Sequence, residues 1–329
     1  MRHISVIVPE GPIVLSSVVG SFKLFNQVNN FLLEQGVAEP AYKVELVGLS
    51  KETELYDGIF TIKPHVSIDE VIQTDLIIVT TILGDMSASI DLNKAFLPWI
   101  RKHYENGAEV ASLCMGAFLL GATGLLDGKR ATTHWMGIDG FSEMFPEVDL
   151  VPQKIITDDN GTYTSGGAYS FLNLLVYMIE KFNGRDMAIM ISKLFEIELD
   201  RHNQSEFVIF NSQKDHGDEA IQKAQNYIEA HFIENLTVDM LADMVALSRR
   251  NFIRRFKKAT RNTPFEYIQR VKVEAAKKSL ERSTDNINEV MIEVGYSDSK
   301  AFRQVFRKLT GCSPNEYKVK YNRHLAKAI

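Results

Sequence analysis

The chain has 329 residues, and its 45% of hydrophobic and 24% of charged residues are ordinary for a globular protein with a sizeable core. The length suits two domains better than one. No apolar run reaches the roughly 18 residues of a membrane helix, and the first apolar stretch is too short for a signal peptide. We therefore expect a cytoplasmic protein without a membrane partner, in which Cys114 and Cys312 form neither a disulfide nor a metal site.

The net charge of −5 conceals two halves of opposite sign. Residues 216–329 hold 21 Lys and Arg against 14 Asp and Glu, a net of +7. The remaining residues hold 16 basic and 28 acidic side chains, a net of −12. This asymmetry indicates that only the C-terminal part meets a polyanion, although charge alone does not exclude a chance segregation of solvated side chains.

The first half alternates strand patterns with helix patterns. Runs rich in Val and Ile predict strands at residues 3–9, 42–50, 75–83 and 108–114. Amphipathic stretches that end at Gly predict helices over 20–36 and 92–107. Further on, the same signals indicate extended runs at 129–135, 154–158 and 161–167, and then an apolar helix at 168–184. The alternation predicts an α/β domain, a parallel sheet flanked by helices.

The pattern changes between residues 185 and 218. We expect a first domain over 1–205, a linker over 206–217 and an all-α domain over 218–329. A weak repeat appears in the last part, where 236–260 and 287–311 each combine a small helix, a short turn and a basic helix. This order predicts two helix-turn-helix units, at about 237–260 and 287–310.

Local signals support both units. Thr237 and Ser248 are expected N-caps in the first copy, and Gly295 is expected in the turn of the second. Each basic helix carries two Phe residues at a spacing of four, so both rings can face a core. These residues are Phe252 and Phe256 in the first copy, and Phe302 and Phe306 in the second.

The opposite faces of these helices are basic. Arg and Gln can bind base edges through paired hydrogen bonds, whereas Lys suits phosphate. The outward residues are Arg249, Arg250, Arg254 and Lys257 in the first copy, and Lys300, Arg303, Gln304 and Arg307 in the second. The alternative is a packing module with two solvated basic helices, which the repetition of the motif disfavours.

The stretch "GYSDSKAFRQVFRKLTGCSPNEYK", residues 295–318, resembles the signature of the AraC/XylS family. Residues 264–282 resemble the linker helix that joins the two helix-turn-helix units of that family. The resemblance covers about 220–321 and implies two helices that insert into successive major-groove segments. The base contacts that it implies are Arg250, Ile253, Arg254, Ser299, Lys300, Arg303 and Gln304. Ile253 is apolar, so it would contact a thymine methyl group or a sugar.

In the first domain, "SLCMGAFLLG", residues 112–121, places a cysteine where a predicted strand meets a helical pattern. A nucleophile at such a turn receives backbone N–H groups, here those of Met115 and Gly116, and the helix N-terminus favours a thiolate. A nucleophile also needs a base. The candidate is His134, which lies 20 residues after Cys114.

Residues 112–135 resemble the ThiJ/PfpI superfamily, whose class I glutamine amidotransferase-like fold is a variant of the flavodoxin-like arrangement. The whole chain resembles its GlxA-like subgroup, in which this domain precedes an AraC-type domain. The resemblance places Cys114 at the sharp turn, His134 beside it and Gly84 in the opposite loop. It also implies that "TSGGAYS", with Gly166 and Gly167, closes the pocket.

One position departs from the enzymes of the superfamily. Where these often have an acid in the first strand-to-helix loop, this chain has Ser17, and Glu10 is out of register. Superfamily proteases have His after the cysteine, where this chain has Met115. A serine hydroxyl cannot serve as acid, base or charge partner at neutral pH. We therefore expect no catalysis, cofactor or metal, and a ligand pocket formed by Ser17, Gly84, Cys114, Met115, His134, Gly166 and Gly167.

Other interpretations of Cys114 remain open: a packed thiol, a working nucleophile or a redox group. The favoured hypothesis is a DNA-binding transcription regulator whose first domain binds a small metabolite and dimerises. The family resemblance implies an activator and an effector among small nitrogenous or amino-acid-related metabolites. The expected partners are promoter DNA, a second copy of the chain and RNA polymerase. The rivals are a cysteine-dependent hydrolase or hydratase with a regulatory DNA-binding tail, and a dimerisation scaffold without a ligand.

Overall fold

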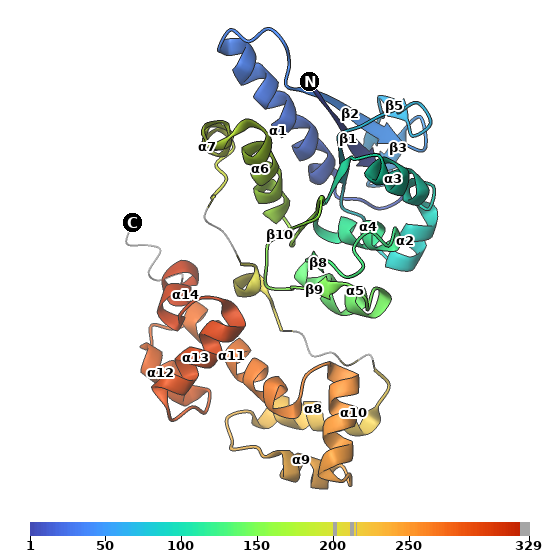
Figure 1. The fold of residues 1–329 in the computed structure, drawn as a ribbon. Helices are drawn as coiled ribbons and strands as arrows, with labels where there is room; N and C mark the ends of the chain where they lie inside the picture. The colour runs from blue at the N-terminus through green and yellow to red at the C-terminus, as the bar shows by residue number, and fades with distance from the viewer. Residues whose placement is uncertain (200–202, 211–213, 215, 323–329) are drawn as a thin grey trace. The chain divides into compact units, whose positions relative to one another are not determined.

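The computed structural model describes residues 1–199, 203–210, 214 and 216–322. It divides into two compact units, residues 1–204 and 205–329 (Figure 1). Each unit has its own hydrophobic core. The first unit is α/β and the second is helical, which confirms the predicted fold classes.

A seven-stranded sheet forms the centre of the described part of the first unit, in the order β10-β11-β7-β6-β1-β2-β5. All neighbours pair in parallel except β10 and β11, which are antiparallel. The strands are β1 (Arg2–Val8), β2 (Tyr42–Gly48), β5 (Val66–Ser67), β6 (Leu76–Val79), β7 (Glu109–Ser112), β10 (Ile156–Asp159) and β11 (Thr162–Ser165). The chain passes from β1 to β2 on one side and returns to β6 on the other, so a ligand-binding edge is expected where the carboxyl ends of β1 and β6 meet.

The predicted strands exist but are shorter than expected at their carboxyl ends. β6 ends at Val79 and β7 at Ser112, because Thr80, Thr81 and Cys114 leave the sheet for other hydrogen bonds. The run at 129–135 contributes only β8 (Arg130–Ala131), which pairs with β9 (Asp149–Leu150) outside the central sheet. A separate hairpin joins β3 (Thr53–Leu55) and β4 (Phe60–Ile62).

Helices cover both faces of the sheet (Figure 1). Helices α1, α6 and α7 pack together on one face, and α2, α3 and α4 on the other. The helices of this unit are α1 (Leu15–Glu34), α2 (Met86–Leu92), α3 (Phe96–Glu105), α4 (Ala117–Ala122), α5 (Ile138–Met144), α6 (Ser170–Asn183) and α7 (Arg185–Leu194). The helix predicted over 92–107 is replaced by α2 and α3, because the buried Asn93 ends α2 and bonds the backbone of Glu10 and Ser89.

The second unit consists of two helical halves that share one long helix. Its helices are α8 (Glu219–His231), α9 (Val238–Met244), α10 (Arg249–Thr260), α11 (Pro264–Arg282), α12 (Ile287–Glu293), α13 (Ser299–Thr310) and α14 (Pro314–Tyr321). Figure 1 shows α11 between the helices of the two halves. Tyr267 and Ile268 of α11 belong to the core of the first half, and Ala276 and Leu280 to the core of the second. No helix of the described residues is long and apolar enough to cross a membrane.

The predicted helix caps are present. Thr237 accepts the Met240 N–H at 3.2 Å, and Ser248 accepts the Asn251 N–H at 3.4 Å. In the second half, Asp298 caps α13, a residue that the sequence had not indicated. A hydroxyl or carboxylate oxygen at this place satisfies N–H groups that the first helical turn leaves unpaired.

Residues 205–210 belong to the second unit rather than to a free linker. The ring of Phe210 lies 5.2 Å from that of Tyr267, in an edge-to-face contact. The carbonyl oxygen of Val208 accepts a hydrogen bond from Lys277. The linker predicted over 206–217 therefore begins with packed residues, because this short segment supplies an aromatic ring and a carbonyl to α11. Residues 211–213 and 215 of that linker lie outside the described part.

The turns of the two halves predict opposite responses to substitution. Ala246 and Gly295 occupy corresponding turns with φ of +52° and +75°. A side chain in this region costs about 1–2 kcal/mol, and the flexibility of glycine in the unfolded chain offsets part of that. We expect Ala246→Gly to raise the free energy of unfolding by about 0.5–1 kcal/mol.

We expect Gly295→Ala to lower that free energy by more than about 2 kcal/mol, since a Cβ there would lie 2.3 Å from the Ile233 carbonyl oxygen. Chemical denaturation followed by far-ultraviolet circular dichroism measures both changes. Tryptophan fluorescence would not report on the second unit, because Trp99 and Trp135 lie in the first unit. Shifts of the same sign in the two variants would contradict this account.

Candidate ligand site and candidate nucleic-acid interface

Cys114 stands at a sharp turn between β7 and the short helical segment Cys114–Gly116. Its φ is +55°, a left-handed conformation that is rare for a residue with a side chain. Two contacts hold the turn: the Cys114 N–H donates to Ser165 Oγ at 3.1 Å, and Thr133 Oγ1 donates to the Cys114 carbonyl at 3.1 Å. The predicted turn is therefore present, and its strain is maintained by neighbouring strand ends.

The thiol of Cys114 is buried, with 6% of the residue exposed. Burial raises its pKa, and three groups that stabilise the thiolate oppose this: the backbone N–H groups of Ala168 and Met115, and the hydroxyl of Thr81. None of the groups that shift this pKa is acidic. The backbone N–H of Met115 was predicted from the sequence, and Ala168 and Thr81 were not; a ligand-binding role for Met115 stays a prediction.

The His134 ring is held by the backbone of its own segment and by a neighbouring glycine. Its Nδ1 accepts the Met136 N–H at 3.0 Å. A Cβ built on Gly167 would lie only 2.4 Å from the ring atom Cδ2, so the ring packs directly on that glycine. No hydrogen bond between described residues joins His134 to Cys114. Burial lowers the pKa of the imidazole.

Burial therefore favours the neutral forms of the Cys114 thiol and the His134 imidazole. A raised thiol pKa and a lowered imidazole pKa disfavour the thiolate–imidazolium pair on which cysteine hydrolases depend. Together with the missing acid, this arrangement favours binding over nucleophilic attack.

Ser17, which takes the place of the acid, has a structural role at the start of α1. Its hydroxyl donates to the Val14 carbonyl at 2.7 Å and accepts the Thr81 N–H at 3.2 Å. Ser17 is completely buried, and its hydroxyl contacts Thr81. Glu10 holds Asn93 through its backbone at 2.8 Å and 3.0 Å.

The predicted glycines differ in their surroundings. Gly166 and Gly167 are buried after β11, and the Gly167 N–H donates to the Gln204 side chain at 2.9 Å. Gly84 is exposed, with φ of +84°, and a Cβ there would meet nothing within 4 Å. A ligand-binding role for these residues stays a prediction.

Four residues near the turn were missed at the sequence level: Thr81, Thr133, Ser165 and Gln204. The hydroxyl residues stand where apolar runs end, so polar side chains at strand termini could have indicated them. Gln204 carried no signal, because it is distant in sequence from all its partners. No group of three or more His, Cys, Asp or Glu in the described chain is placed to hold a metal ion.

The raised thiol pKa predicts a slow reaction of Cys114 with iodoacetamide at neutral pH. In a Cys312→Ser background, we expect the alkylation rate to reach half its plateau above the ordinary thiol pKa of about 8.5, because only the thiolate reacts. Thr81→Val should move the midpoint further upward, since the thiolate loses the Thr81 hydroxyl, which donates to the Leu113 carbonyl at 3.1 Å in the structure and can turn to the thiolate.

Thr80→Val is the matched control, since the Thr80 hydroxyl donates to the Ile7 carbonyl at 2.9 Å and is not among the groups that shift the thiol pKa. A midpoint at or below the ordinary value in the parent protein would instead indicate an activated nucleophile.

In the second unit, the two basic helices α10 and α13 present the predicted faces. The rings of Phe252, Phe256, Phe302 and Phe306 are completely buried, which confirms their predicted orientation. The outward residues Arg249, Arg250, Arg254, Lys257, Lys300, Arg303, Gln304 and Arg307 are all exposed, and Ile253 and Ser299 are half-buried. The structure thus leaves two rows of donors at the surface.

Some of these side chains are positioned by local contacts. Arg249 pairs with Asp239 at 2.6 Å, and Arg254 donates to Asn251 at 2.9 Å. Arg303 donates to the hydroxyl of Ser299 at 3.2 Å. Exposed pairs of this kind contribute little to stability, so these guanidinium groups remain available to a polyanion.

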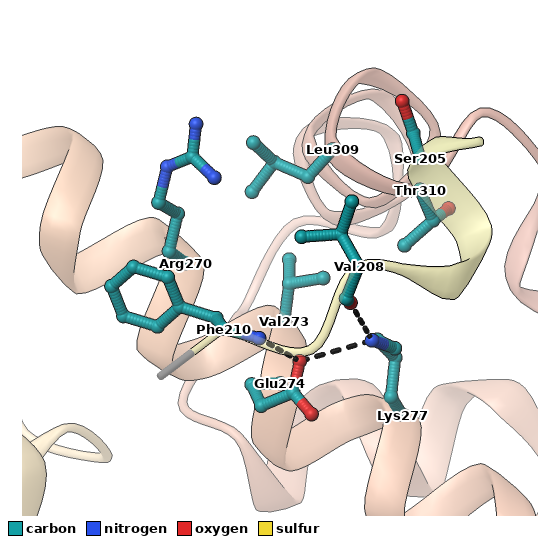
Figure 2. Close-up of a pocket in the computed structure, with 9 residues that line it drawn as sticks. All are labelled: Ser205, Val208, Phe210, Arg270, Val273, Glu274, Lys277, Leu309 and Thr310. Carbon is teal, nitrogen blue, oxygen red and sulfur yellow. Dashed lines mark hydrogen bonds and ion pairs between the residues drawn. The ribbon is translucent and has the colours of Figure 1, made fainter. Parts of the chain in front are cut away.

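A small hollow that is open to solvent lies in the second unit between residues 205–210 and α11 (Figure 2). It is lined by Ser205, Val208, Phe210, Arg270, Val273, Glu274, Lys277, Leu309 and Thr310. Figure 2 shows Lys277 between the Val208 carbonyl and the Glu274 carboxylate, with which it forms bonds of 2.6 Å and 3.0 Å. This hollow was not expected from the sequence.

Comparison with known families supports both parts of the chain. Residues 18–181 match the DJ-1/PfpI family, and residues 241–320 match a helix-turn-helix domain. These matches confirm the two resemblances that the sequence indicated.

Individual curated proteins match parts or most of the chain. The HTH-type transcriptional regulator ArgR of Pseudomonas aeruginosa is 28% identical over 212 residues, 64% of each chain. The regulator GbdR of the same species is 24% identical over 306 residues, 92% of this chain and 80% of that protein. The isonitrile hydratase of Pseudomonas putida is 32% identical over 101 residues, 30% of this chain and 42% of that enzyme. The chain spans just under two thirds of the first of these regulators.

Proposed function

We propose that the chain is a DNA-binding transcription regulator controlled by a small metabolite, from the match of residues 18–181 to the DJ-1/PfpI family and of residues 241–320 to a helix-turn-helix domain, which resembles the AraC type. The observation that carries the proposal is the pair of exposed basic faces on α10 and α13. Relatives that carry the name of transcription regulator match most of the chain, which supports it further.

DNA binding follows from the charge and geometry of the second unit. Residues 216–329 carry a net charge of +7, so they attract the phosphate backbone. Each basic helix is held by two buried Phe rings and can present its outer face to a major groove. In this proposal Arg250, Arg254 and Arg303 bind base edges, while lysines contact phosphates.

The effector site in this proposal lies around Cys114. Two backbone N–H groups and the Thr81 hydroxyl face the thiol. At the start of α6, the hydroxyl of Ser170 is buried and makes no hydrogen bond in the described structure. A buried donor without a partner is costly, so a ligand oxygen at this place would satisfy it.

The remaining parts of the proposal rest on the family resemblance and on the N–H donors. An effector with a carboxylate or another anionic group fits N–H donors at a helix start, in line with amino-acid-related metabolites. The regulator would act as a homodimer, bind promoter DNA and activate transcription through RNA polymerase.

A cysteine-dependent hydratase or hydrolase is the second candidate function. The similarity of 101 residues to an isonitrile hydratase supports it. The neutral thiol and imidazole, and the serine at position 17, favour the regulator.

Base reading predicts that two single substitutions weaken DNA binding. With a duplex that the full chain selects from a randomised library, Arg254→Ala and Arg303→Ala should each reduce affinity by about 1–3 kcal/mol. Fluorescence anisotropy measures the dissociation constants, and Arg185→Ala, an exposed arginine of the first unit, is the control. Unchanged affinity in both variants would remove these residues from the interface.

A sensor predicts that a metabolite stabilises the full chain. A ligand at 100 times its dissociation constant should add about 2.7 kcal/mol of stability, seen as a higher melting temperature in a screen of amino-acid-related and other nitrogenous metabolites. Cys114→Ala should abolish the shift, and Cys312→Ala should retain it. An effector site is contradicted if no ligand shifts the parent protein, and isocyanide turnover by the full chain would favour the hydratase.

A further inference from the structure

A single peptide bond joins a buried anchor in the first unit to a packed segment in the second. Gln204 is the last residue of the first unit, and only 1% of it is exposed. The next residue, Ser205, begins the segment 205–210, which we call the strap. On both sides of this peptide bond, which we call the joint, the residues are fixed by contacts within their own units.

The Gln204 side chain is held by hydrogen bonds from both of its polar atoms within the first unit. Its Oε1 accepts the Gly167 N–H at 2.9 Å. Its Nε2 donates to the carbonyl oxygens of Pro152 and Thr133 at 2.8 Å and 2.9 Å. Its backbone N–H donates to the Gln153 carbonyl at 3.0 Å. A buried amide that loses such partners leaves unsatisfied polar groups, so Gln204 and its partners are expected to move together.

The partners of Gln204 belong to the site around Cys114. Gly167 packs against the His134 ring. Thr133, whose carbonyl oxygen accepts from Gln204 at 2.9 Å, donates its hydroxyl to the Cys114 carbonyl at 3.1 Å. The backbone N–H of Ala168, the residue after Gly167, favours the thiolate and lowers the pKa of Cys114. Gln204 therefore holds the loop that brings two groups of the candidate ligand site together.

The strap is held just as firmly by α11. The Lys277 ammonium, whose side chain is 5% exposed, donates to the Val208 carbonyl at 2.6 Å and to Glu274 at 3.0 Å (Figure 2). The Phe210 N–H donates to the same carboxylate at 3.3 Å. A buried ammonium needs such partners, so a shift of the strap must be followed by Lys277 or be costly.

The strap contacts both helix-turn-helix halves. Its Phe210 ring packs on Tyr267, which belongs to the core of the first half. At its other end, the Glu206 carboxylate pairs at 2.7 Å with Lys320 on α14, in the second half. A displacement of the strap would thus reach the two halves that carry the two basic helices.

We propose that Gln204 is the positioning residue that couples the Cys114 site to the DNA-binding unit through the strap. The proposal rests on the proposed function, because it requires an effector at the first site and DNA at the second. An occupant that binds the loop of Gly167 and Ala168 displaces the partner of Gln204, and the joint transmits that displacement to Ser205 and the strap. The free energy by which DNA binding changes cannot exceed the difference between the occupant's binding free energies for the two positions of the loop and strap.

Gly167→Ala serves as a built-in stand-in for the unidentified effector. Its Cβ would lie 2.4 Å from the His134 ring, so the ring or the loop must shift. Gly140→Ala is the matched control, because a Cβ there would be 3.9 Å from the Phe118 ring, an ordinary contact. DNA affinity of the full chain is measured by anisotropy with the duplex selected by the parent protein.

Two variants break the coupling in different ways. Gln204→Met keeps the approximate volume and removes the side-chain hydrogen bonds, and insertion of two glycines after Gln204 keeps all contacts but loosens the joint. We expect Gly167→Ala to change the dissociation constant about fivefold or more in the parent chain and to have little effect in either uncoupled background. Gly140→Ala should have little effect on the dissociation constant in the parent chain, in Gln204→Met and in the insertion variant. If Gln204→Met fails to fold, as judged by circular dichroism, the insertion variant decides the outcome.

A second readout separates positioning from general stability. In the Cys312→Ser background, Gln204→Met should move the midpoint of Cys114 alkylation to higher pH, because the Ala168 N–H is no longer held at the thiol, whereas the glycine insertion should leave it unchanged. An unchanged midpoint in Gln204→Met would overturn the positioning role.

The coupling is overturned if Gly167→Ala has the same effect in a folded uncoupled background as in the parent, or has none in the parent. The failure of the proposed function looks different, since the parent chain would then select no duplex at all.

Discussion

The left-handed turn at Cys114 is the constraint on which the organisation of the first unit depends. A residue with a side chain adopts this conformation only where its surroundings compensate for the strain. Here the compensation comes from the ends of neighbouring strands, through Ser165 and Thr133. The same turn buries the thiol, and burial keeps the thiol protonated. A geometry that presents nucleophiles in other proteins therefore presents here a neutral group among hydrogen-bond donors.

In the second unit, two charged helices, α10 and α13, have to be held rigidly at the surface. Like charges along α10 and α13 repel one another, and two buried Phe rings fasten each helix against that repulsion. The shared helix α11 contributes to the cores of both halves, so it limits how far one half can move without the other. Its charged residues Glu274 and Lys277 are turned inward, where they hold the strap instead of facing solvent.

The two units are connected in sequence by the peptide bond between Gln204 and Ser205, and they differ in charge. The acidic first unit repels a polyanion, whereas the basic second unit attracts one. In the proposed regulator, a small change around the Cys114 loop adds no charge near the DNA, so its effect has to pass through contacts. The route that we propose is the anchored residue Gln204 followed by the packed strap.

The sequence alone determined most of the second unit and the outline of the first. Caps, turn residues and the spacing of Phe are local signals, so α11 and the helix-turn-helix units begin and end at the predicted residues. In the first unit the strands were recognised, but their carboxyl ends were predicted too long, because hydropathy does not show where Thr80 and Thr81 turn to side-chain hydrogen bonds.

Only the tertiary structure decided which groups surround the thiol. Ser17 and Thr81 meet because β1 and β6 are neighbours in the sheet, and Ser165 reaches Cys114 because β11 lies beside β7. Gln204 reaches Gly167 from the end of the unit. These contacts join residues far apart in the sequence, and they depend on the order of the strands in the sheet and on the path of the chain after its last helix. The spacing of apolar residues along the sequence specifies neither of these.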